Sequence, residues 1–67
     1  MKYYVNDNPQ PTGEHEVHKS DCSWLKIARS KTPLGDFASC GGAMIAARKI
    51  YSNVDGCAFC ASACHKK

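Results

Sequence analysis

The sequence has 67 residues, a net charge of +3 and five cysteines. That length allows one domain, residues 1–67, and a domain of this size buries only about 60% of the surface that its unfolded chain exposes. No apolar stretch is long enough to span a bilayer, and an isoelectric point near 8.7 lies below the range typical of dedicated nucleic-acid-binding domains. We therefore expect a thin core that a metal or disulfides must reinforce.

Two short strands are predicted in the first third of the chain. Residues 2–6 (K-Y-Y-V-N) are rich in Tyr and Val, and residues 14–19 (E-H-E-V-H-K) can form the second strand of a hairpin, across a loop containing Pro, Asn and Gly. Neighbouring side chains of a strand point to opposite faces. For this reason His15 and His18 cannot both readily face one site.

The middle of the chain predicts a turn, a loop and a third strand. Cys22 lies in or near the turn, and Trp24 and Leu25 after it are the expected core anchors. Residues 26–33 are polar and basic and predict a loop, whereas residues 33–38 (P-L-G-D-F-A) predict a short strand.

One helix is predicted, over about residues 40–52, with Ser39 as its N-cap. Its apolar side chains recur at helical spacing and form one stripe: Ala43, Met44, Ala47, Ile50 and Tyr51. N-V-D-G then predicts a turn before the cysteine-rich end of the chain. The fold class that follows is α+β: a small antiparallel sheet of two to three short strands with one main helix, stapled by zinc.

The pair Cys57 and Cys60 is the sharpest local motif. Two thiolates spaced C-x-x-C on a tight turn can bind one metal from the same side, and Gly56 before them suits a sharp backbone path. Such a pair needs a second pair, which His18 and Cys22 supply from a strand end and the turn that follows it. The predicted site is tetrahedral, with three cysteines and one histidine, and zinc fits that ligand set best.

Several roles stay open for the other cysteines. Cys64 lies one helical turn after Cys60 and is the alternate ligand, in a four-cysteine site without His18, and His65 is a weaker rival. For Cys40 we prefer the role of a small buried apolar residue; the alternatives are a thiol made acidic by the helix N-terminus and the disulfide partner of Cys64.

The expected compartment favours metal over disulfides. The start M-K-Y-Y-V-N-D-N-P has no apolar signal-peptide core and no small-residue cleavage site, so we expect a cytoplasmic protein whose thiols stay reduced. Five cysteines would also leave one over in a closed disulfide set. Because protein side chains fill all four metal positions, we expect a structural site and no catalytic residues.

Three segments occur in the same order as in a known family: H-K-S-D-C-S-W-L, P-L-G-D-F-A-S-C-G-G-A-M-I-A-A and G-C-A-F-C. Over roughly residues 18–60 the chain resembles the Ada-type metal-binding domain, the N-terminal zinc module of the Ada DNA-repair methyltransferase. The resemblance implies that Cys22, Cys57 and Cys60 bind Zn²⁺, with His18 in the place of the family's first cysteine. In the family that first cysteine accepts a methyl group from a methylated DNA phosphate, which a zinc-bound imidazole cannot do.

Three functions follow from these observations. The first, which we favour, is a stand-alone structural zinc module that binds a protein or nucleic-acid partner. Its densest basic region comprises Lys19, Lys26, Arg29 and Lys31. The second is an Ada-like thiol that accepts an alkyl group through Cys22 or a neighbour. The third is a small protein stabilised by disulfides, without metal.

Overall fold

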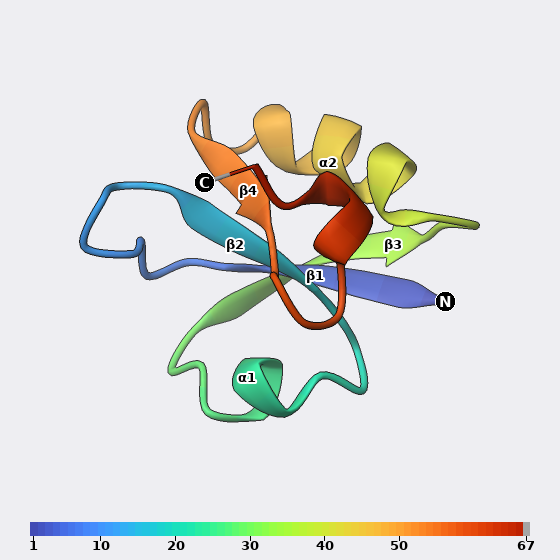
Figure 1. Ribbon diagram of the computed structural model, residues 1–67, viewed down its shortest axis with the longest axis horizontal. Coiled ribbons are helices and arrows are strands. Elements are labelled where there is room, and N and C mark those ends of the chain that lie inside the picture. The colour runs from blue at the N-terminus through green and yellow to red at the C-terminus, as the bar shows by residue number, and fades with distance from the viewer. Residues whose placement is uncertain (67) are drawn as a thin grey trace.

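Four short strands form one mixed sheet in the computed structural model, which describes residues 1–66 (Figure 1). They are β1 (Lys2–Asn6), β2 (His15–Lys19), β3 (Lys31–Asp36) and β4 (Val54–Gly56), in the spatial order β3-β1-β2-β4. β1 pairs with β2 and β3 in antiparallel orientation, whereas β4 runs parallel to β2. The predicted α+β class is confirmed, but the sheet is mixed rather than antiparallel and has four strands rather than two or three.

Two strand assignments from the sequence are wrong. The predicted turn N-V-D-G is mostly strand β4, a segment of three residues that is too short to show a period and forms by pairing with β2. β3 begins at Lys31 and ends at Asp36, two residues earlier than predicted at each end, because its register is set by pairing with β1. Pro33 is tolerated because β3 is an edge strand.

Two α-helices lie on opposite sides of the sheet (Figure 1). The main helix, α2 (Cys40–Arg48), ends earlier than predicted, so Ile50 lies beyond it and is exposed. Ser39 occupies the N-cap position, but its side chain makes no capping hydrogen bond. The single-turn helix α1 (Ser23–Lys26) occupies part of the predicted turn, and a 3₁₀ turn, η1 (Ser62–Cys64), lies near the end of the chain.

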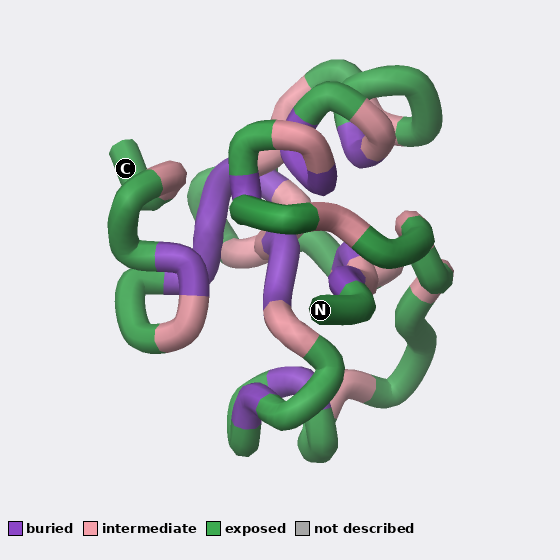
Figure 2. Tube along the Cα trace, turned by 90° about the vertical axis from the view of Figure 1, so that its right-hand side faces the viewer, coloured by how far each residue is buried: buried purple, intermediate pink, exposed green. Residues whose placement is uncertain are grey.

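The core lies between the sheet and α2. Apolar side chains of β1 and β2 meet small and apolar side chains of the helix: Tyr3, Val5, Val17, Ala43, Met44 and Ala47. Figure 2 shows the buried stretches of the chain gathered at the centre, with exposed loops around them. Leu25 is buried as predicted, whereas the expectation for Trp24 is wrong, since half of this residue is exposed.

β2 is buried on both of its faces, which matters for the site. Val17 is fully buried in the core, and the next residue, His18, is only 1% exposed although it points the other way, towards the α1 side. In the described residues, 1–66, no helix is long and apolar enough to cross a membrane.

Candidate metal centre

Four side chains from three separate segments meet on the α1 side of the sheet: those of His18, Cys22, Cys57 and Cys60. One ligand atom from each lies within 4.8 Å of the others. His18 belongs to β2, Cys22 is the residue before α1, and the C-x-x-C pair follows β4. The residues that the sequence predicts as ligands are therefore brought together.

Backbone pairing explains why these segments converge. The amide of Cys57 donates a hydrogen bond to the carbonyl of Val17 (3.0 Å), which continues the parallel β2–β4 ladder and sets Cys57 beside His18. The amide of Cys22 donates to the carbonyl of Lys19 (3.1 Å), so the chain turns directly after β2. The amide of Ala61 donates to the carbonyl of Cys57 (2.9 Å), which closes the turn that carries Cys60.

The spacing of the ligand atoms suits one tetrahedral metal ion. The sulfurs of Cys22 and Cys57 are 3.9 Å apart, and the sulfur of Cys60 lies 3.8 Å from Nδ1 of His18. A tetrahedral ion with metal–sulfur bonds of about 2.3 Å has sulfur atoms about 3.8 Å apart. Disulfide sulfurs are separated by only about 2.0 Å. The group can therefore hold a metal ion as it stands.

His18 has the protonation and orientation of a ligand. Burial lowers the pKa of its imidazole and so favours the neutral form. Nδ1 faces Cys60, while Nε2 lies 3.5 Å from a carboxylate oxygen of Glu16. A carboxylate beside the second ring nitrogen is common for metal-bound histidines, because it fixes the tautomer and the ring orientation.

The three thiols lie so close together that ionising more than one of them is unfavourable. Burial, together with hydrogen bonds to Cys22 and Cys57, raises the pKa of Cys60 to about 12, although the backbone N–H of Lys19 donates to its sulfur (3.3 Å). For Cys22, burial acts to raise the pKa, but hydrogen bonds, above all with Cys60, outweigh it and the pKa is lowered. A divalent cation would remove this conflict by stabilising all three thiolates together.

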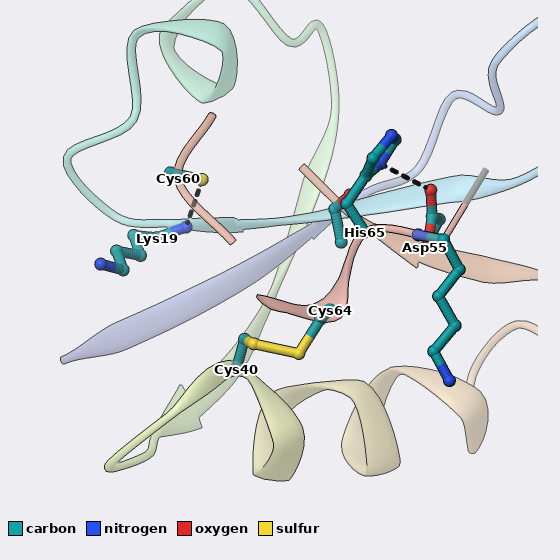
Figure 3. Close-up of a disulfide and its surroundings, with 8 residues drawn as sticks. Lys19, Cys40, Asp55, Cys60, Cys64 and His65 are labelled. Carbon is teal, nitrogen blue, oxygen red and sulfur yellow. Dashed lines mark hydrogen bonds and ion pairs between the residues drawn. A yellow bond between two sulfur atoms is a disulfide. The ribbon is translucent and has the colours of Figure 1, made fainter. Parts of the chain in front are cut away.

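The other two cysteines lie outside this group. Cys64, the alternate ligand predicted from the sequence, is bonded to Cys40 at the start of α2, with the sulfurs 2.05 Å apart (Figure 3). Cys40 is buried, but it is a disulfide partner rather than the free apolar residue that we preferred. The pairing was one of three open alternatives, and nothing local in the sequence selects it.

The remaining histidines also point elsewhere. Nδ1 of His65 lies 3.0 Å from Asp55 Oδ2 and 3.0 Å from the carbonyl of Gly56, on the β4 side (Figure 3). The ring of His15 stacks on Tyr51, with centroids 3.7 Å apart. Our prediction that only one of the two β2 histidines reaches the site is confirmed.

Sequence reasoning missed the residues that support the ligands. Glu16 is two positions before His18, so strand alternation alone puts both on one face, and this signal was available. The hydrogen bond from the amide of Lys19 to Cys60 depends on the tertiary fold and has no local signal.

Fold and centre together define a small α+β protein with a buried group of three cysteines and one histidine that can hold a metal ion. No protein-family model, curated protein or solved structure matches the chain. The Ada-type relationship therefore stays a prediction.

Proposed function

We propose that this protein is a structural zinc module whose metal holds together a surface that binds a partner, with no chemistry of its own. The observation that carries the proposal is the meeting of one imidazole and three thiols, whose ligand atoms lie within 4.8 Å of one another. Zinc is favoured because a set of three cysteines and one histidine is typical of structural zinc sites.

Burial supports a structural over a catalytic role. His18, Cys22 and Cys57 are between 1% and 6% exposed, so the centre offers little room for a substrate. Protein atoms would fill all four positions, whereas catalytic zinc keeps one for water or substrate. The centre also joins segments that are distant in the sequence, as structural metals do.

The relationship to the Ada-type domain is likewise our proposal: a diverged, stand-alone relative. The order and spacing of Cys22, Cys57 and Cys60 support it. The alkyl-acceptor function gains less support, because an acceptor thiolate must be reached by its substrate: Cys22 and Cys57 are buried, and Cys60 alone of the three is partly exposed. A cytoplasmic location rests on the sequence argument alone.

Cobalt(II) titration of the metal-free protein tests the proposal. We expect one equivalent to bind and to give the visible bands of a tetrahedral ion together with sulfur-to-cobalt charge transfer, and zinc to displace the cobalt. His18→Cys should strengthen the charge-transfer band by adding a fourth thiolate, whereas the matched control, Cys40→Ala with Cys64→Ala, should leave the band unchanged. A weak octahedral spectrum, or a fold that is identical without metal, would contradict the proposal.

A further inference from the structure

Two aromatic rings are exposed directly beside the metal centre. Trp24 and Phe59 stack on each other, with ring centroids 5.9 Å apart and planes inclined by 27°. Trp24 is 50% exposed, Phe59 77% and the neighbouring Ile27 70%. A cluster of large apolar side chains in water marks an interaction site rather than a core.

The position of both rings depends on the metal ligands. Trp24 is two residues after Cys22, and Phe59 lies between Cys57 and Cys60. A metal that joins Cys22 to the C-x-x-C turn therefore also joins the two rings. The stacked pair is a rigid platform only when its two segments are fastened together.

Grooves open on either side of Trp24. One, of about 210 Å³, runs between Trp24 and Phe59 over Cys57. The other, of about 320 Å³, is lined by Trp24, Ile27 and Arg29 and by three side-chain amides: Asn6, Asn8 and Gln10. Trp24, Gln10 and Glu16 line both grooves, so flat rings, amide groups, a guanidinium and one carboxylate share one face.

The excess of basic side chains lies in the stretch of sequence that contains Trp24, although Lys19 lines a different hollow, with Cys40 and Cys60. Residues 19–31 contain four basic side chains and one acidic one, whereas the rest of the chain holds five of each. The modest overall charge therefore hides a local excess of +3. The second groove has Arg29 in its wall, and Lys26 belongs to the same short helix as Trp24.

We propose that this face binds single-stranded nucleic acid. Bases stack against Trp24 and Phe59, amides beside Trp24 meet base edges, and Arg29 and Lys26 attract the phosphates; exposed rings beside positive charge are the usual means of binding single strands. In a duplex the faces of the bases are covered by their neighbours, and an acidic peptide has no bases to stack on the rings. Both should therefore bind more weakly than a single strand. The inference rests on the proposed function, because the metal holds the two rings together.

Trp24 is the only tryptophan of the chain, so its fluorescence reports directly on the platform. We would titrate the zinc-loaded protein with an oligothymidylate of about 15 nucleotides. Saturable quenching that weakens as salt is raised is expected. Phe59→Ala should weaken binding about 5- to 150-fold, the range for loss of one stacked base. Arg29→Ala should weaken binding and flatten the salt dependence.

Two variants on α2 and its end serve as matched controls. Ile45→Ala removes another exposed apolar side chain, and Lys49→Ala another exposed cation, and both should bind as the unmodified protein does. Trp24→Phe keeps a stacking ring and, followed with a labelled oligonucleotide, should retain most of the affinity.

Three results would overturn the inference. They are an unchanged affinity in Phe59→Ala and Arg29→Ala, equal binding of a duplex of the same length, and equally effective competition by polyglutamate. The zinc content of every sample is measured first. A folded, zinc-loaded protein that fails to bind the oligonucleotide overturns this inference alone, whereas a protein that takes up no zinc overturns the proposed function as well.

Discussion

Cysteines link both ends of the segment that follows β4, residues 57–64, to the rest of the fold, and the two links differ in kind. Cys57 and Cys60 join the group beside β2 and α1, whereas Cys64 is bonded to Cys40 on α2, on the other side of the sheet (Figures 1 and 3). In the first link, the sulfur of Cys60 lies close to the imidazole of His18 and accepts a hydrogen bond from the backbone N–H of Lys19. In the second link, Cys40 and Cys64 pack in the apolar core. The surroundings of each sulfur, rather than its spacing in the sequence, separate ligand from disulfide.

Gly56 lies between the two links, because it precedes Cys57 and its backbone packs against Cys64. A Cβ atom there would stand 2.7 Å from the carbonyl oxygen of Ala61 and 2.7 Å from Cβ of Cys64. We had expected Gly56 to permit a sharp turn. Its backbone is not left-handed, however, so this glycine is required for close packing instead. The returning segment thus lies directly on the strand from which it started.

The largest expected effect is that of removing the metal clamp. Cys57→Ser should unfold the chain, because structural zinc contributes about 10–16 kcal/mol. That is as much as the whole stability of an ordinary domain, about 5–15 kcal/mol. Far-UV circular dichroism of the variant, and of the unmodified protein after chelation, measures the effect. Retention of the native spectrum in both samples would mean that the metal contributes little to the stability of the fold.

The next effect concerns the one ligand that is not sulfur. His18→Ala should weaken zinc binding by more than the roughly 10- to 100-fold typical of losing a supporting residue. His18→Cys should restore most of the affinity by completing a four-cysteine site. Competition with a chromophoric chelator measures both affinities. Equal affinities for His18→Ala and the unmodified protein would remove His18 from the ligand set.

Removing the disulfide should cost less. Cys40→Ala with Cys64→Ala opens a loop of 24 residues and should lower the free energy of unfolding by about 3 kcal/mol, while zinc stays bound. Urea denaturation and metal analysis measure the two quantities. A double variant that loses its zinc would show that zinc binding depends on the disulfide. The disulfide contradicts our expectation that all thiols stay reduced, and alkylation of thiols in freshly lysed cells would show whether it forms there.

Gly56→Ala tests the contact between the two links. The added methyl group must displace backbone atoms, so we expect a loss of about 1–3 kcal/mol, typical of overpacking. Gly41→Ala is the control, since a Cβ there has ordinary contacts only. Denaturation of both variants in urea compares them, and equal stabilities would contradict the proposed close approach.

The smallest effect concerns Asp7, the residue after β1. Hydroxyl groups of Ser30, Thr32 and Tyr51 donate hydrogen bonds to Asp7 and lower its carboxyl pKa. The resulting stability is present above the unfolded pKa, near 3.8, and is lost as pH falls through the lower folded pKa. By NMR titration, Ser30→Ala should raise this pKa more than Tyr51→Phe does. The reverse order would contradict the assignment.

The group of three cysteines and one histidine was predictable because its parts are local. His18 with Cys22 and Cys57 with Cys60 are each close in the sequence, and ligand chemistry links the two pairs. The disulfide was not, because it joins a helix start to a 3₁₀ turn whose positions depend on the whole fold. Sequence reasoning therefore brought together the four side chains of the group, but it left the pairing of Cys40 and Cys64 open.

The strands and the aromatic pair show the same limit. β4 exists only through its pairing with β2, and three residues carry no periodicity. Trp24 and Phe59 break the rule that aromatic residues are buried, and no feature of the sequence distinguishes them from core residues.

Native mass spectrometry of protein purified without chelator, beside its denatured mass, tests the central claim most directly. We predict one zinc ion that is lost on denaturation, and a denatured mass lower by the two hydrogens that one disulfide removes. Such a result would mean that three of the five cysteines stay thiols to hold the metal. No metal, with a mass lower by the four hydrogens of two disulfides, would contradict the account.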